Sequence, residues 1–116
     1  MNSKEKILLE NFNEYYSFAL KALSEKKYNT ATTLFFKSIV ALCDLYILKK
    51  TGSAPSSHSS RFRIMEEKFP KLYFIADKDL PFYQDSYSKR MGSEEAEMLR
   101  KDAEKLKKII EEIFGW

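Results

Sequence analysis

Turn-forming residues are scarce in this chain, and that scarcity limits the folds open to it more than any other feature. The 116 residues include 3 glycines and 3 prolines. An all-β domain of this size needs many tight turns, and tight turns use glycine and proline. The chain is therefore expected to consist of few, long elements.

Apolar residues recur with the spacing of an α-helix along most of the chain. The clearest run places residues at alternating steps of 3 and 4 on one helical face, namely Ala96, Leu99, Ala103, Leu106, Ile110 and Ile113. The same analysis predicts helices over residues 3–23, 28–50, 60–69, 72–91 and 93–114. The fourth is expected to break near Pro81, which suits the first position of a new helix over 82–91. We predict one all-α domain over residues 1–116, an antiparallel up-down bundle of four to five helices.

The helix expected over residues 28–50 is apolar nearly all round, so it should be buried on more than one side. It is either the central helix of the bundle or a dimer face. Its longest apolar run, Ile39–Leu48, spans ten residues and includes Asp44, which is too short and too polar to cross a bilayer. Asp44 is expected to form a partly exposed ion pair.

Aromatic residues make up 15% of the chain, with 9 Phe, 7 Tyr and 1 Trp. A core this small has limited room for them, since each buried ring removes about 150–250 Å² from water. A surplus of rings favours a subunit interface, and hence a homodimer, or a surface that stacks on a ligand. A core rich in Phe and Tyr is the alternative.

Charge and cysteine usage exclude several classes of protein. The net charge of +3 is spread along the chain, without the basic stripe expected of a protein held on nucleic acid by counterion release. A single cysteine, Cys43, permits no internal disulfide and fits the reduced cytoplasm. The first residues, MNSKEKILLENF, lack the uninterrupted apolar core of a signal peptide. The chain has one histidine and no metal-ligand spacing, so neither a metal site nor a cofactor is expected.

No set of residues forms a complete catalytic constellation, but two places are candidate binding sites. On a helix, Tyr83 and Tyr87 would be neighbours and Arg90 would follow at i+3, with Lys89 adjacent. Two phenols and a guanidinium on one face suit stacking on a base and binding of a phosphate. The alternative is tyrosines packed on the bundle, with Arg90 paired to an acid. His58 is the second candidate, in a serine-rich loop just before a helix, where it could also contact only backbone or water.

Three segments together resemble the HEPN domains of archaea and bacteria. They are YNTATTLFFKSIVALCDLYILKKTG, then a short loop with His58 opening the next helix, then LPFYQDSYSKRMGSEEAEMLRKDAEKLKKII. The resemblance extends over about residues 5–114. It implies a bundle of four or five helices that dimerises. The family includes toxins that cut RNA, partners of small nucleotidyltransferases, and members proposed to bind nucleotides.

The catalytic motif of the ribonuclease members of that family is missing. In those members an arginine is followed, after four to six residues, by a histidine near the start of the last helix. Here Arg90 is followed by MGSEEAE, which puts Glu95, Ala96 or Glu97 in the histidine's place. No arginine lies within six residues upstream of His58.

These observations predict a non-catalytic HEPN-like accessory module. It would be homodimeric and would bind either a protein partner, such as a small nucleotidyltransferase, or a nucleotide. The alternative is a helical RNA-binding or protein-interaction domain with no nucleotide role. A residual ribonuclease is the third possibility.

Overall fold

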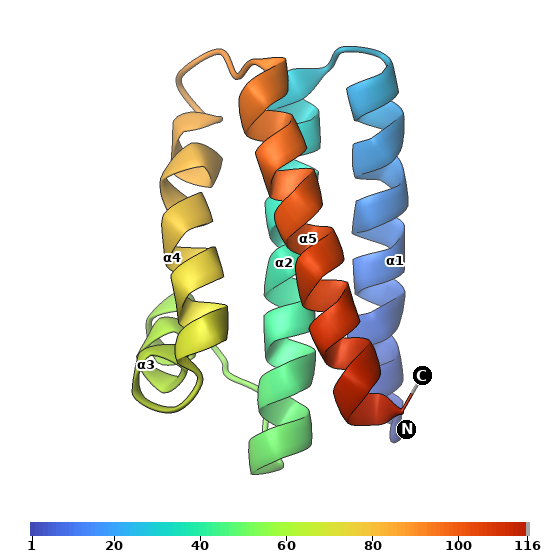
Figure 1. The fold of residues 1–116 in the computed structure, drawn as a ribbon, viewed down its shortest axis with the longest axis vertical. Helices are drawn as coiled ribbons and strands as arrows, with labels where there is room; N and C mark the ends of the chain where they lie inside the picture. The colour runs from blue at the N-terminus through green and yellow to red at the C-terminus, as the bar shows by residue number, and fades with distance from the viewer. Residues whose placement is uncertain (116) are drawn as a thin grey trace.

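Five helices make up the computed structural model, which describes residues 1–115 (Figure 1). They are α1 (Ser3–Ser24), α2 (Tyr28–Thr51), α3 (His58–Lys68), α4 (Pro70–Asp85) and α5 (Ser93–Phe114). Within the described residues there is no strand. The all-helical class predicted from the scarcity of turn-forming residues is confirmed.

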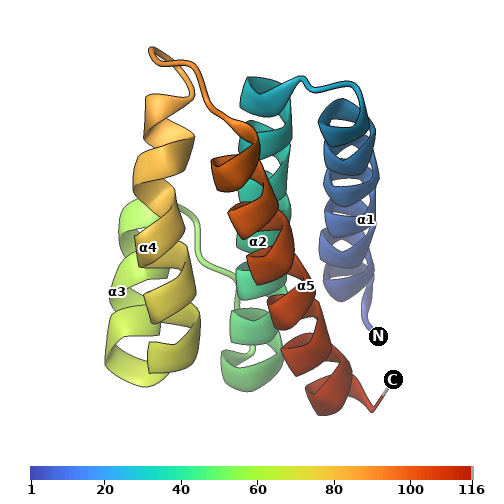
Figure 2. The same ribbon diagram turned by 45° about the horizontal axis from the view of Figure 1, so that its top comes forward.

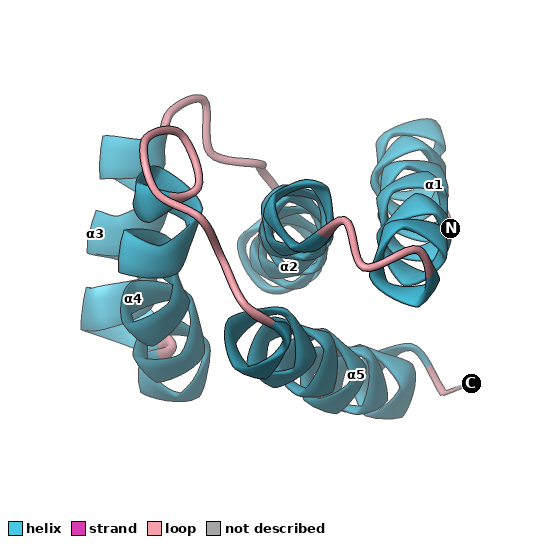
Figure 3. Ribbon diagram, turned by 90° about the horizontal axis from the view of Figure 1, so that it is seen from above, coloured by secondary structure: helices cyan, strands magenta, loops and turns pink. Residues whose placement is uncertain are grey.

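Helix α2 is the central helix of the bundle. Seen along the bundle, it lies among α1, α4 and α5 (Figure 3). Its side chains supply much of the core, with Phe35, Ile39, Leu42 and Leu45 all completely buried. Of the two roles considered for this apolar helix, the structure therefore supports the central one, and α2 offers little free surface for a dimer.

Helix α2 is also long and apolar enough, by length and composition alone, to cross a membrane. Of the 18 consecutive residues of α2 with the highest mean hydropathy, 72% are buried inside the bundle. The core helix of a folded domain meets the same criterion, so this feature is weak support for a membrane segment. That the protein does not bind or cross a membrane stays a prediction.

The ends of the long helices follow from local sequence. At the start of α1 the Asn2 side chain accepts a hydrogen bond from the Glu5 amide at 2.8 Å, and the Glu5 carboxylate accepts one from the Asn2 amide at 2.9 Å. This reciprocal capping box satisfies two amides that the helix itself leaves free. At the end of α2, Gly52 has a φ of +88°, a left-handed conformation that glycine adopts at no steric cost.

The prediction for residues 72–91 was wrong about the break near Pro81 and about the end of the helix. Helix α4 begins at Pro70, runs through Pro81 without a break and ends at Asp85. An internal proline removes one helical hydrogen bond, at a cost of about 3 kcal/mol. The buried face of α4, with Leu72, Ile75 and Ala76, offsets that cost by packing into the bundle.

The connection between α4 and α5 is held from outside by Asn29 in the first turn of α2. Its side-chain amide donates to the carbonyls of Ser86 at 2.9 Å and Lys89 at 2.7 Å. Its side-chain oxygen accepts from the Met91 amide at 2.9 Å. These three bonds fix residues 86–91 as a non-helical connection, which is why the helix predicted to reach 91 stops at Asp85.

A buried acidic group lies where α4 meets α5. The Asp79 side chain is fully buried, and neither carboxylate oxygen has a hydrogen-bond partner among the described residues. Lys78 Nζ lies 3.4 Å from one of those oxygens and donates to Asp102 of α5 at 2.7 Å. Burial, followed by the neighbouring Asp102, raises the pKa of Asp79 to about 8.

Candidate functional site

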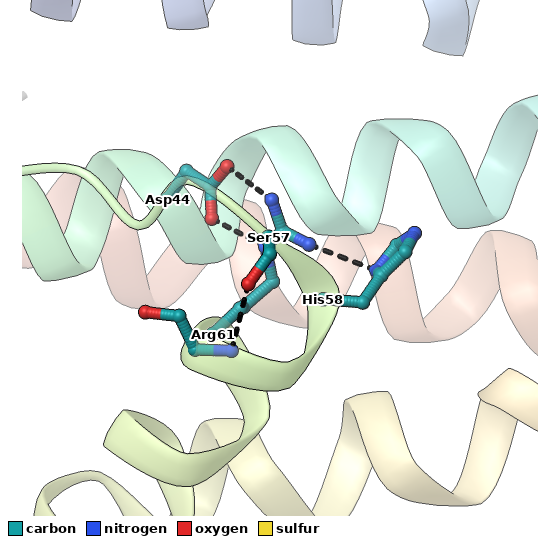
Figure 4. Close-up of polar contacts among 5 residues, drawn as sticks. Asp44, Ser57, His58 and Arg61 are labelled. Carbon is teal, nitrogen blue, oxygen red and sulfur yellow. Dashed lines mark hydrogen bonds and ion pairs between the residues drawn. The ribbon is translucent and has the colours of Figure 1, made fainter.

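A buried ion pair joins α2 to α3. The Arg61 guanidinium donates to both carboxylate oxygens of Asp44, from Nε at 2.6 Å and from Nη2 at 2.9 Å (Figure 4). The side chains of Arg61 and Asp44 are only 10% and 11% exposed. An ion pair for Asp44 was predicted from its place in an apolar run, and the structure supplies its partner. The pair is buried, however, and not partly exposed as expected.

Arg61 also fixes the orientation of His58, which is the first residue of α3. The Arg61 Nη1 atom lies 2.8 Å from His58 Nδ1, one helical turn away. A guanidinium can only donate, so Nδ1 must be the acceptor. In the neutral ring the proton is then carried by Nε2. In Figure 4 the His58 side chain extends from the start of α3, away from Asp44.

This arrangement favours the neutral form of His58. Partial burial, and next the positive charge of Arg61, lower the pKa of His58 below its usual value. Since the unperturbed imidazole titrates near pH 6.5, His58 is neutral at pH 7 and above. It therefore presents an N–H donor to solvent through Nε2. With Nδ1 engaged and Nε2 protonated, the ring has no free nitrogen with which to accept a proton.

The ion pair and His58 border a pocket of about 360 Å³. We call it the α2–α3 pocket. Its lining comes from α1, α2, the loop before α3, the start of α3 and α4: Leu8, Asn11, Tyr15, Phe36, Lys37, Val40, Ala41, Asp44, Ser56, Ser57, His58, Arg61 and Tyr83. His58 and Tyr83 also line a second hollow between α3 and α4, of about 520 Å³. These two residues therefore stand between two depressions.

Hydrogen-bond donors predominate among the polar groups of the α2–α3 pocket. Lys37 forms no ion pair with any residue in 1–115, and its Nζ lies 6.0 Å from the centre of the Tyr15 ring. Asp44, the one carboxylate in the lining, is already bound by Arg61. A ligand would thus meet an unpaired ammonium and a neutral imidazole N–H beside aromatic rings. That combination suits an anionic or acceptor-rich group.

Tyr83 and Tyr87 form the contact that their spacing predicts. Their hydroxyls are 2.9 Å apart and their rings pack edge to face with centroids at 5.5 Å. The hydrogen bond to Tyr87, and next partial burial, raise the pKa of Tyr83 to about 12. Tyr83 also stacks on Phe36 of α2, at 4.7 Å between ring centroids, whereas Tyr87 is 75% exposed.

Arg90 and Lys89 lie apart from this pocket. Because α4 ends at Asp85, neither Tyr87 nor Arg90 lies on the helix that carries Tyr83, so the predicted common helical face was wrong. Arg90 is exposed in the α4–α5 connection, and Lys89 lies 3.5 Å from Asp85. Of the five residues predicted to form a binding site, the structure brings His58 and Tyr83 to the same pocket, and Tyr87 contacts Tyr83 without lining that pocket.

Sequence reasoning missed Arg61 and Lys37. A charged residue in the apolar run of α2 indicated that a cation was needed for Asp44, but several lysines and arginines could have supplied it. Arg61 is the partner because the loop of residues 52–57 lets the start of α3 fold back beside α2, next to Asp44. The spacing of His58 and Arg61, one turn apart on a helix, was the available signal.

Two other candidate chemistries find no support in the described residues. Cys43 is completely buried, and burial raises the pKa of its thiol, so it is unreactive core. No group of three or more His, Cys, Asp or Glu side chains within residues 1–115 is placed to hold a metal ion.

Comparison of the chain with protein-family models, with curated proteins and with solved structures finds no significant match.

Proposed function

We propose that this protein is a non-catalytic accessory module of the HEPN type, acting in the cytoplasm as a homodimer. Its fold would be the antiparallel up-down bundle of that family. It would bind a nucleotide, or a protein partner such as a small nucleotidyltransferase, at the α2–α3 pocket. The observation that carries this proposal is the buried Asp44–Arg61 pair, which holds His58 in one orientation at that pocket.

A buried ion pair is weak support for a purely structural role. Desolvating two charges costs several kcal/mol each, and well-packed apolar residues often serve stability equally well or better. Here the pair has a further consequence, because it directs the third donor of Arg61 onto His58. We therefore take the pair as a positioning device for the His58 N–H donor.

The size and polarity of the pocket support binding of a small chemical group. Ligand sites commonly occupy about 300–1,000 Å³ and combine apolar walls with a few polar groups. The α2–α3 pocket has a volume of about 360 Å³, at the lower end of that range. It would accommodate part of a nucleotide or the acidic side chain of a protein partner, and Lys37 would provide the countercharge.

Binding at this pocket is tested with Lys37→Gln and Tyr83→Ala. Protein isolated from its native host is analysed by mass spectrometry for bound proteins and small molecules, and purified protein is titrated with ATP and adenosine by NMR. We expect Lys37→Gln to weaken the binding of ATP or of the captured partner about tenfold, because an anion loses its charged donor.

Two further variants locate the binding surface. Lys27→Gln, on an exposed lysine between α1 and α2, is the matched control and should bind as the parent does. Arg90→Ala tests the connection that the structure separates from the pocket. If Lys37→Gln and Tyr83→Ala retain every ligand and partner of the parent, the pocket has no binding role. Loss with Arg90→Ala alone would move the site to the α4–α5 connection.

We also expect no ribonuclease activity. Cleavage of RNA by this family's mechanism needs a side chain that acts as a general acid or base near neutral pH. The only histidine, His58, has one ring nitrogen bound by Arg61 and the other protonated. Purified protein should leave tRNA and mRNA intact over hours in gel assays. RNA cleavage that is abolished by His58→Ala or by Arg90→Ala would contradict the non-catalytic proposal.

A further inference from the structure

One hollow, lined by both basic and apolar side chains, lies at one end of the outer side of α4 and α5. The first turns of α4 and the second half of α5 border a depression of about 680 Å³, lined among others by Lys71, Phe74, Lys105, Lys108, Ile109 and Glu112. We call it the basic hollow. Phe74 is 69% exposed, more than any other phenylalanine of the described residues.

Lysines outnumber acidic residues in the lining of the basic hollow. Lys71, Lys105 and Lys108 are exposed, and none of them forms an ion pair with another residue in 1–115. Glu112 is the one acidic residue of the lining. An occupant that brings acidic groups to this rim and an apolar group to Phe74 would complement it.

The other end of the same helix carries an acidic hollow. This depression of about 450 Å³ lies on the first half of α5 and is lined by Ser93, Glu94, Glu97, Met98, Lys101 and Asp102. Glu94 is exposed and forms no ion pair within the described residues, whereas Glu97 and Asp102 are paired to Arg100 and Lys78. Half-buried Met98 is its apolar member.

The two hollows lie in line on one face of α5. Glu94, Met98, Lys101, Lys105 and Lys108 follow each other at steps of 4, 3, 4 and 3, which keeps them on a single stripe. Figures 1 and 2 show α5 on the outside of the bundle, next to α4. This face therefore passes from an acidic end to a basic end. A surface of that kind is complementary to itself after a two-fold rotation.

We infer that a second copy of this chain docks on the α4–α5 face, related by a two-fold axis that passes near Lys101 and Asp102. Glu94 of each copy then lies against Lys105 and Lys108 of the other. Phe74 of each copy enters the acidic hollow of the other and packs beside Met98, a favourable sulfur–aromatic contact. Two otherwise exposed phenyl rings leave water in the process. This inference rests on the proposed homodimer and specifies its interface.

Sedimentation equilibrium at low and at high salt tests the interface. We expect the parent to be a dimer at tens of micromolar and Phe74→Arg to be a monomer. Glu94→Lys and Lys105→Glu should each weaken the dimer about tenfold at low salt, since every reversal acts twice across a two-fold axis. The double variant Glu94→Lys, Lys105→Glu should regain most of the parent's affinity, because it restores opposite charges.

Phe18→Arg is the matched control, because Phe18 is also an exposed phenylalanine, 57% accessible, but lies on α1. It should leave the dimer unchanged, and thermal melting should show all variants folded. A dimer that survives Phe74→Arg, that is broken by Phe18→Arg, or that the double charge swap fails to restore overturns this interface while leaving the proposed homodimer standing. A monomeric parent overturns both the interface and the homodimer, and leaves the ligand proposal to its own titrations.

Discussion

Replacing Arg61 with alanine is expected to lower the free energy of unfolding by about 3–5 kcal/mol, the usual cost of leaving one member of a buried pair alone. The substitution strands the Asp44 carboxylate beneath the start of α3, where its side chain is only 11% exposed. Urea denaturation followed by circular dichroism measures the effect as a shift of the midpoint with an unchanged slope.

Two variants separate stability from function at this pair. Arg63→Ala, on an exposed arginine two residues along α3, should change the unfolding free energy by no more than about 0.5 kcal/mol. The double variant Asp44→Leu, Arg61→Met should recover most of the stability, because apolar residues of similar size replace both charges. It should nevertheless lose binding at the α2–α3 pocket, because His58 is no longer held. A loss below about 1 kcal/mol for Arg61→Ala would show that the pair is hydrated.

Replacing Asp79 with asparagine is expected to stabilise the protein at alkaline pH, on the order of 2 kcal/mol at pH 9. The folded pKa of Asp79 is raised to about 8, against about 3.9 in an unfolded chain. Between those values the folded state holds a proton that the unfolded state has lost. The contribution of neutral Asp79 is therefore complete below about pH 4 and is lost as the pH rises through 8. Asparagine resembles the neutral acid at every pH.

The measurement is the unfolding free energy of parent and Asp79→Asn at intervals from pH 5 to pH 9. The gap between the two curves should widen in favour of the variant as the pH rises. Asp77→Asn, on an exposed carboxylate of the same helix, should run parallel to the parent. Parallel curves for Asp79→Asn would mean that Asp79 is ionised throughout and that Lys78 compensates its charge.

The helical class could be read from the sequence because it depends on local chemistry. Scarce turn residues, the 3–4 spacing of apolar positions in α5, the capping box at Asn2 and the glycine after α2 each act over a few residues. Features that depend on distant contacts could not be read in this way. The end of α4 was missed because Asn29, far away in sequence, ends it, and because tertiary packing overrides the effect of Pro81.

The candidate site was partly predictable for the same reason. Tyr83 and Tyr87 are four residues apart, and their predicted contact forms even though Tyr87 lies in the turn just after the end of α4. His58 was noticed as the only histidine, but its partner Arg61 gains meaning only once α3 folds back on α2 and places Asp44 within reach. Arg90 was placed wrongly because its position depended on the helix continuing past Asp85.

The hold of Asn29 on the α4–α5 connection also has a consequence for the order in which the chain folds. Its three hydrogen bonds join residues separated by 57, 60 and 62 positions, so each closes a long loop whose entropy must be lost before the bond forms. The α1–α2 hairpin, by contrast, needs only short-range closure. Residues 86–91 should therefore become ordered after the α1–α2 hairpin has formed. The first turn of α2 then serves as a template for a segment that is synthesised much later.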